Sequence, residues 1–208
     1  MGLLRKFFSN TGKPEGVMGK IVVAMMNKGH AGIASWGFSH LKLRGDETVL
    51  DCGCGGGANI AVFLGMLPEG QVTGLDYSPV SVEKAREVNS AAIATGRCSI
   101  VQGNVQALPF DDGGFDVVTA FETVYFWPEL PRCFGEMHRV LKPGGVFMIT
   151  NEASGRTKSH EKWQKIVDNM SVYTGEELEK LLTGAGFARV EIDEDLGHDR
   201  LNVRAYKG

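Results

Sequence analysis

The chain of 208 residues is long enough for one domain with a single core, and a second full domain is not expected. Its 43% hydrophobic and 23% charged residues are typical of a soluble globular protein. No apolar run approaches the roughly 20 residues that cross a bilayer, and no signal-peptide pattern opens the chain, so we expect neither an integral membrane protein nor a secreted one.

The four cysteines bear on the cellular compartment of the protein. Cys52, Cys54, Cys98 and Cys133 lack the spacing of a zinc site, and two of them stand one residue apart inside a glycine-rich run. They are typical of reduced thiols, and we therefore predict a cytoplasmic protein without a metal centre.

The net charge of −3 is unevenly distributed along the chain. Residues 1–44 carry seven Lys or Arg against one acidic residue, so this arm has a net charge of +6 and the remainder −9. A basic arm can attract nucleic acid, an anionic substrate or a membrane surface, or it can simply carry solvated lysines that pack against an acidic body.

Two apolar helical stretches are predicted before the main domain. Residues 16–28 are apolar on nearly every face and end at Gly29, and a second helix is expected over residues 31–41. Together they predict an N-terminal helical cap or lid over residues 1–45.

From residue 46 to 208 the pattern alternates between short apolar runs and helices, which is typical of βαβ units. Ser78 and Pro79 form a plausible start for the second helix. The predicted strands span residues 47–52, 71–76, 98–102, 115–121 and 145–151. The predicted helices between them span residues 58–67, 79–95 and 129–141.

The end of the chain carries a helix and a strand pair. Thr174 and Glu177 form a capping box that opens a helix to about residue 183. Strands are predicted at 187–194 and 200–206, and the short connection between them requires an antiparallel pair. The predicted fold is therefore α/β: a Rossmann-like doubly wound sheet, mostly parallel with an antiparallel last strand, plus the N-terminal helical cap.

The most informative segment is residues 49–60, where a strand runs into Gly53-x-Gly55-x-Gly57 and then a helix. Glycines allow unusual backbone dihedrals and let a ligand approach the main chain. The same residues also fit the dinucleotide fingerprint Gly-x-Gly-x-x-Ala, so an NAD or FAD enzyme has to be considered. Asp76, at the end of the second strand, can accept hydrogen bonds from ribose hydroxyls in either case.

The size of the sheet favours a mononucleoside ligand. The strands finish within about 160 residues and close with an antiparallel pair, whereas a dinucleotide enzyme usually has a second mononucleotide-binding half.

The chain also resembles the class I S-adenosylmethionine-dependent methyltransferases over about residues 45–207. Within that family it is similar to the branch of ubiquinone/menaquinone-biosynthesis-type and other small-molecule methyltransferases. Five motifs in the family's order carry the resemblance: Val49 to Gly57, Val72 to Ser78, Gly103 to Phe110, Phe115 to Val118, and Arg139 to Gly145.

The resemblance implies S-adenosylmethionine as the cofactor and gives each motif residue a role. Asp51, Gly53 and Gly55 would hold the methionine part, within the loop that Gly57 completes. Asp76 would bind the ribose and Tyr77 one face of the adenine. The adenine edge would meet Asn104 and Val105, with Asn104 standing where the family often has Asp. Phe121 would lie near the sulfonium.

The acceptor side is less defined, because methyl transfer from a sulfonium requires alignment and only sometimes a base. Glu122 and His30 are the candidate proton acceptors, and no catalytic residue is assigned beyond them. Trp36, Tyr125 and Trp127 are the candidate substrate-binding aromatics. Each of these residues has an alternative role in packing or at the surface.

We predict a methyltransferase that acts on a small molecule by in-line transfer, as a monomer or homodimer. One alternative is an enzyme acting on nucleic acid or protein through the basic arm, although this arm lacks the dense Arg/Lys and interleaved aromatics of a nucleic-acid surface. Another is a protein that binds S-adenosylmethionine without catalysis. The NAD enzyme is the least favoured.

Overall fold

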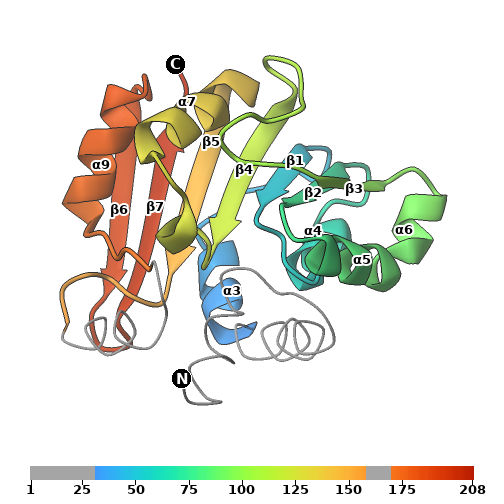
Figure 1. Cartoon of the computed structure of the whole chain (residues 1–208), viewed down its shortest axis with the longest axis horizontal. Helices are drawn as coiled ribbons and strands as arrows, with labels where there is room; N and C mark the ends of the chain where they lie inside the picture. The colour runs from blue at the N-terminus through green and yellow to red at the C-terminus, as the bar shows by residue number, and fades with distance from the viewer. Residues whose placement is uncertain (1–30, 158–169) are drawn as a thin grey trace.

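A computed structural model describes residues 31–157 and 170–208, and these form one sheet with helices on both faces (Figure 1). The predicted helix at 16–28 and His30 lie outside the described residues. The sheet has the strand order β3-β2-β1-β4-β5-β7-β6. Its strands are β1 (Thr48–Cys52), β2 (Gln71–Asp76), β3 (Cys98–Gln102), β4 (Phe115–Phe121), β5 (Leu141–Asn151), β6 (Arg189–Asp195) and β7 (Arg200–Tyr206).

The sheet is parallel from β3 to β5, and β7 runs antiparallel to both of its neighbours. The four residues between β6 and β7 are too few for a crossover, so β7 must turn back beside β6. The predicted α/β, Rossmann-like sheet with an antiparallel last strand is therefore confirmed.

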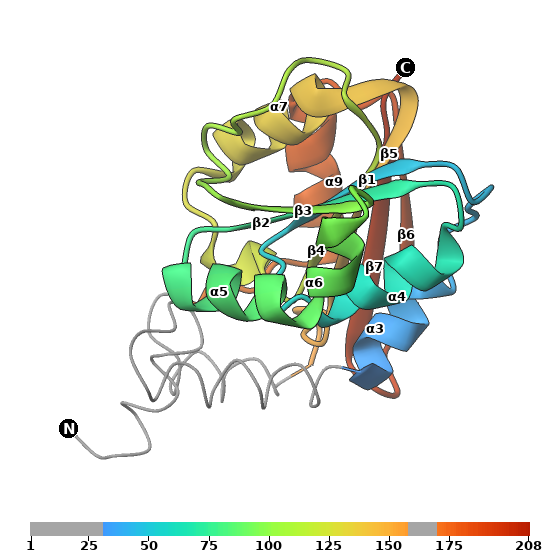
Figure 2. The same cartoon turned by 90° about the vertical axis from the view of Figure 1, so that its right-hand side faces the viewer.

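The helices form two layers (Figure 2). One layer has α3 (Ala31–Phe38), α4 (Ala58–Met66), α5 (Pro79–Val88) and α6 (Ser90–Ala94), and the other has α7 (Leu130–Val140) and α9 (Gly175–Gly184). Each layer encloses its own apolar cluster against the sheet, with Phe63 central to the first and Phe134 to the second. Gly37 fits α3 closely onto the sheet, since a Cβ there would lie 2.7 Å from Phe121 Cε1 and from Thr150 Oγ1.

Local signals correctly placed two helix starts. The Ser78 hydroxyl accepts a hydrogen bond from the Ser81 backbone N–H at 3.4 Å, with Pro79 in the first helical turn. The Thr174 hydroxyl and the Glu177 carboxylate exchange reciprocal bonds with each other's backbone N–H groups, as a capping box requires.

Three predicted boundaries were wrong. The helix expected over 79–95 breaks at Asn89, whose side-chain amide donates to the carbonyl oxygens of Gly57 and Ala85, both at 3.0 Å. The strand expected to begin at 145 begins at Leu141, because Leu141 pairs with Phe115 ahead of a bulge. The helix expected over 31–41 ends at Phe38.

Candidate functional site

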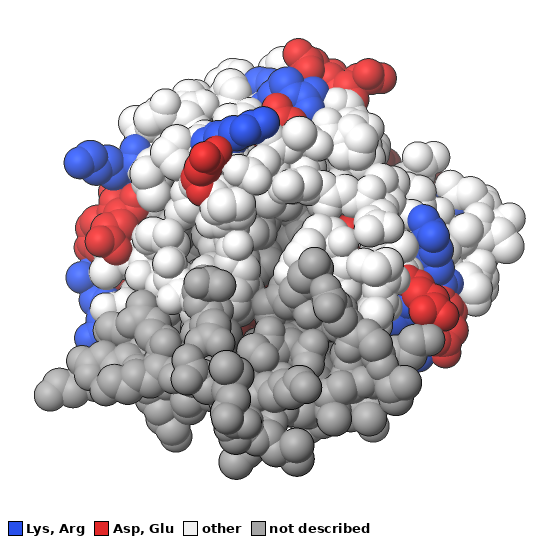
Figure 3. Space-filling view, in the orientation of Figure 1, with Lys and Arg blue, Asp and Glu red and all other residues white. Residues whose placement is uncertain are grey.

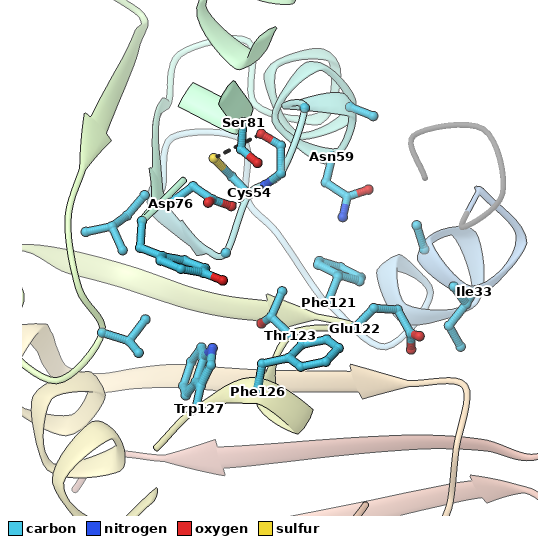
Figure 4. A pocket seen from close by; sticks show the side chains of 18 of the residues that line it. Ile33, Cys54, Asn59, Asp76, Ser81, Phe121, Glu122, Thr123, Phe126 and Trp127 are labelled. Atoms are coloured by element: carbon cyan, nitrogen blue, oxygen red, sulfur yellow. Dashed lines mark hydrogen bonds between the residues drawn. The ribbon is translucent and has the colours of Figure 1, made fainter. Parts of the chain in front are cut away.

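A cavity of about 770 Å³ opens at the carboxyl ends of the parallel strands, where α/β sheets usually bind ligands. Figure 3 shows the described surface hollowed near its centre, with most of the coloured charged side chains toward the edges of the molecule in this view. Figure 4 shows the chain after β4 facing Asp76 and Cys54 across the cavity. Its lining comes from α3 (Ala31, Ile33, Ala34, Ser35, Phe38), the glycine loop and α4 (Gly53, Cys54, Gly55, Gly56, Ala58, Asn59, Val62), the ends of β2 and β3 (Leu75, Asp76, Tyr77, Ser81, Gly103, Asn104, Val105) and the chain after β4 (Phe121, Glu122, Thr123, Phe126, Trp127, Pro128).

The three loop glycines all have left-handed backbones, with φ of 76°, 52° and 77° at Gly53, Gly55 and Gly57. Their surroundings differ. A Cβ on Gly53 would lie 2.5 Å from Thr123 Cγ2, and one on Gly57 would lie 2.5 Å from Asn89 Nδ2. A Cβ on Gly55 would have no protein atom within 4 Å. Gly53 and Gly57 are therefore required by protein packing, whereas Gly55 leaves space open beside the main chain.

Asp76 lies between the glycine loop and the helix that follows β2. Its Oδ2 accepts the Gly55 backbone N–H and its Oδ1 the Ser78 backbone N–H, both at 2.9 Å. Burial raises the pKa of this carboxyl, and the backbone hydrogen bonds oppose that shift. The Tyr77 backbone and the Ser81 side chain also bond to this carboxyl and oppose the shift, so Asp76 gathers hydrogen-bond donors at the cavity wall.

Asp51 is buried one strand away from Asp76. Its Oδ1 accepts the Thr119 hydroxyl across the β1–β4 pair at 2.9 Å, whereas Oδ2 has no hydrogen-bond partner among the described residues. Burial raises the pKa of Asp51 to about 7, with the neighbouring Asp76 charge contributing. An unpaired buried carboxylate oxygen is costly, and a cationic or hydrogen-donating group would relieve that cost.

The three residues expected around an adenine lie on one wall of the cavity. Tyr77 is 45% exposed, and Asn104 and Val105 follow β3 on the neighbouring loop. The Asn104 amide oxygen already accepts the Gln106 backbone N–H at 3.0 Å, which leaves one of its two acceptor positions.

The chain after β4 places Glu122 in the cavity wall with a left-handed backbone, φ 58°. A non-glycine residue with positive φ is uncommon and suggests a functional constraint. Glu122 Oε1 accepts the Glu152 backbone N–H and the Tyr125 hydroxyl. Burial raises the pKa of Glu122 to about 8, and the Glu152 charge adds to that effect.

The candidate aromatics are not all at the cavity. Trp127 lines it, but Trp36 packs its ring edge against His40 and is absent from the lining. Tyr125 is buried and is absent from the lining, and its hydroxyl accepts the Ala153 backbone N–H at 2.9 Å. Of two further histidines outside the lining, His198 is largely exposed, whereas His138 is half-buried with its ring against Phe187.

Sequence reasoning missed several residues that position the site. Ile33, Phe38 and Phe126 line the cavity, but their apolar side chains look like ordinary core residues in the sequence. Arg139 was noted only as part of a motif. Its guanidinium donates to the carbonyl oxygens of Leu108 and Phe110, at 3.0 and 2.8 Å, and so holds the loop that carries Asn104.

Neither a metal-binding cluster nor a membrane-spanning helix is found among the described residues. Within the described ranges no cluster of three His, Cys, Asp or Glu side chains is arranged to hold a metal ion. Among the helices that the structure describes, none has the length and apolar character to span a membrane.

A doubly wound sheet with an antiparallel β7 between β5 and β6, a glycine loop after β1 and a carboxylate at the end of β2 facing one cavity defines the Rossmann-like methyltransferase fold. The chain belongs to the methyltransferase domain family, whose model matches residues 43–194.

Three similar proteins illustrate the family. Cycloartenol-C-24-methyltransferase 1 of Oryza sativa subsp. japonica is 30% identical over 162 residues, which are 73% of this chain and 46% of that protein. Phosphoethanolamine N-methyltransferase 2 of Haemonchus contortus, solved with S-adenosyl-L-methionine, aligns with a TM-score of 0.80 at 15% identity and covers all of this chain and 60% of its own. The [4+2]-cyclase SpnF aligns with a TM-score of 0.67 at 20% identity, covering 96% and 90%.

The similar proteins differ in how much of their length this chain covers and in what the similarity shows. The chain spans less than half the length of the first curated relatives that it matches. The two solved structures share the fold, and the cyclase shows that this fold also occurs in proteins named for another reaction.

Proposed function

We propose that the protein transfers the methyl group of S-adenosylmethionine to an apolar small molecule bound between α3 and the chain after β4. The observation that carries this proposal is the division of one cavity into two unlike parts. The part around Gly55, Asp76 and Tyr77 is polar, and the part around Phe38 and Phe126 is apolar. The volume of about 770 Å³ lies within the range of about 300 to 1,000 Å³ that is typical of small-molecule sites.

The described residues fit the cofactor. The unpaired Oδ2 of Asp51 and the backbone of Gly53 and Gly55 are proposed to hold its methionine part, because an ammonium would satisfy that oxygen. The open space beside Gly55 admits a ligand against the main chain. Gly57 supports this loop by packing against Asn89.

The nucleoside is assigned to the other wall of the cavity. Asp76 is proposed to bind the ribose hydroxyls, and Tyr77, Asn104 and Val105 the adenine. Phe121 is proposed to lie near the sulfonium, since it joins the two parts of the cavity.

The acceptor is assigned to the apolar part. Ile33, Phe38 and Phe126 exclude water from this end, and holding the nucleophile in line with the methyl group supplies much of the rate, up to about 7 to 11 kcal/mol for well-oriented reactants. When bound, the cofactor supplies an activated methyl group on a good leaving group. Glu122 is the ionisable side chain on this wall, and we propose it as the proton acceptor for substrates that must lose a proton.

The relative from Oryza sativa is named for methylation of a sterol, which supports an apolar acceptor. A finer placement in the ubiquinone/menaquinone-type branch, with a ring-bearing apolar acceptor, is also part of our proposal. A cytoplasmic location is supported by the four cysteines, which are all free thiols. A monomer or homodimer stays a prediction.

A second candidate is a protein that binds S-adenosylmethionine but uses the cavity for another reaction. The likeness to a cyclase of the same fold favours it. A nucleic-acid substrate is less favoured, because none of the described lining residues is Lys or Arg.

Calorimetry tests the cofactor assignment. We expect S-adenosylmethionine and S-adenosylhomocysteine to bind and NAD not to bind, and we expect Asp76→Asn to lose about 1 to 3 kcal/mol of binding free energy. The exposed Asp111 lies outside the cavity lining, so Asp111→Asn is the matched control. Equal binding by Asp76→Asn would refute the role of Asp76. Transfer of a labelled methyl group to sterols and phenols then separates the two candidates, since the second predicts binding without transfer.

A further inference from the structure

The charged side chains that the described residues bring to the cavity are all of one sign. Among the described lining residues, Asp76 and Glu122 carry carboxyl groups, and no Lys, Arg or His is present. In a site that is shielded from water, such an arrangement favours a cationic ligand over a neutral ligand of the same shape. The two states of the cofactor differ in this respect, because S-adenosylmethionine has a sulfonium where its demethylated product has a neutral thioether.

The hydrogen bonds around Glu122 determine which of its oxygens can carry a proton. The Tyr125 oxygen accepts the Ala153 N–H at 2.9 Å, so the hydroxyl proton of Tyr125 is free to point toward Glu122 Oε1 at 3.4 Å. The Glu152 N–H donates to the same oxygen. Because Oε1 receives two donors, a proton on this carboxyl must reside on Oε2.

Oε2 makes no hydrogen bond within the described part of the chain and belongs to a side chain in the cavity wall (Figure 4). Hydrogen bonds hold Glu122 and the residue that follows it to the neighbouring strands. The Glu122 N–H donates to Thr150 O at 2.9 Å, and the next residue, Thr123, donates from its hydroxyl to Cys52 O at 3.2 Å. Thr123 also packs directly on Gly53. Glu122 is therefore held next to the glycine loop.

The surroundings of Glu122 favour its neutral form when no cation is present. Burial raises the pKa of Glu122 to about 8, and Glu152, the charged neighbour on the chain after β5, adds to the effect. Tyr125 is the other titratable group that faces it, and α3 presents no charged residue to the cavity. A positive charge in the cavity would lower this pKa, whereas a thioether would leave it unchanged.

We propose that Glu122 discriminates between the cationic cofactor and its neutral product. The Oε2–H bond breaks and its proton passes to bulk water when the cation binds, and Oε2 takes a proton back once the positive charge has left with the methyl group. The product is then bound beside a neutral carboxyl and lacks the charge attraction that holds the cation. This inference rests on the proposed function, since it requires S-adenosylmethionine to bind in this cavity.

The test is the ratio of the dissociation constants of S-adenosylhomocysteine and S-adenosylmethionine, measured by calorimetry from pH 6 to 9. Both ligands share the ammonium and the adenosine, so the ratio cancels contributions from Asp51 and Asp76. We expect it to rise by up to about tenfold per pH unit as the pH approaches 8 and to level off above. Buffers of different ionisation enthalpy should show up to one proton released on binding S-adenosylmethionine at pH 7. An analogue with an ammonium in place of the sulfonium should behave similarly.

Two variants assign the effect to this residue. Glu122→Gln keeps the oxygen that accepts from Tyr125 and Glu152 but cannot ionise, so its ratio should not change with pH. Glu152→Gln, at an exposed position outside the lining, removes the charge that helps to raise the pKa of Glu122, so it should shift the transition to lower pH. This second variant decides the matter if Glu122→Gln does not fold.

A flat ratio in the native protein would overturn the inference, as would an unchanged transition in Glu122→Gln or in Glu152→Gln. In those cases both ligands still bind, and the proposed function stands. Failure of both ligands to bind would instead refute the proposed function itself.

Discussion

Alanine at Gly55 should mainly weaken ligand binding, whereas alanine at Gly57 should mainly lower the stability of the fold. Both residues are left-handed, and an alanine there costs about 1 to 2 kcal/mol of strain, offset by about 0.4 to 1 kcal/mol from the less flexible unfolded chain. At Gly55 nothing else is added, because its Cβ would have no protein neighbour within 4 Å. We expect Gly55→Ala to lose about 1 kcal/mol of unfolding free energy.

Gly57 is crowded. A Cβ there would lie 2.5 Å from Asn89 Nδ2 and 2.9 Å from Ala85 Cα, and moving Asn89 would break its hydrogen bonds to Gly57 O and Ala85 O. Overpacking of this kind costs about 1 to 3 kcal/mol. With the net backbone strain of about 1 kcal/mol, Gly57→Ala should therefore lose about 2 to 4 kcal/mol of unfolding free energy.

The loss of ligand affinity should be larger for Gly55→Ala than for Gly57→Ala. The methyl group in Gly55→Ala occupies the open space beside the main chain, so we expect S-adenosylhomocysteine to bind at least about tenfold more weakly, a loss of 1.4 kcal/mol or more. Urea unfolding measures the stability change and calorimetry the affinity, under conditions in which each variant is folded. If Gly55→Ala binds as tightly as the native protein, the loop does not contact the ligand at Gly55. Equal stability of the two variants would contradict the packing argument for Gly57.

Three further predictions concern residues around the site. Arg139→Lys should lose the bonds to Leu108 O and Phe110 O, lowering the unfolding free energy by about 2 to 4 kcal/mol and weakening S-adenosylhomocysteine binding in calorimetry. Lys207→Met removes the ammonium that donates to His138 O and Leu141 O, both at 2.8 Å, at the end of α7; about 1 to 2 kcal/mol of stability should be lost in urea while binding stays unchanged. Burial raises the pKa of Asp51 to about 7, so the folded protein holds a proton that the unfolded chain releases near pH 4, and stability should fall as the pH rises between these values. Between pH 5 and 8 the native protein should lose about 3 kcal/mol more than Asp51→Asn, and equal losses in urea titrations would contradict this assignment.

Much of the fold follows from local patterns in the sequence. The apolar runs mark the strands, Ser78 and Thr174 cap their helices as predicted, and the four residues between β6 and β7 allow only an antiparallel pair. These features depend on residues that are close together in the chain. The break at Asn89 does not, because the Asn89 amide bonds to Gly57, 32 positions earlier.

The residues expected at the cofactor follow the ends of successive parallel strands, so their meeting at one edge of the sheet was predictable for the same reason, and their roles stay a prediction. The positions of the residues expected at the substrate were not predictable. Trp36 and Tyr125 were expected at the substrate, but the structure places Trp36 away from the cavity and Tyr125 behind Glu122. Aromatic residues have the same appearance in a sequence whether they line a cavity or pack a core.

The sequence by itself determined the family of the protein, the approximate positions of its strands and the antiparallel pairing of β6 with β7. Only the tertiary structure decided the state of Glu122. Its burial, its contact with Tyr125 and the nearby Glu152 bring together β4, η1 (Val124–Phe126) and the chain after β5, and the protonation of a carboxyl depends on every group that surrounds it in space. Residue type and spacing identify a carboxyl, whereas folding determines which oxygen faces the ligand.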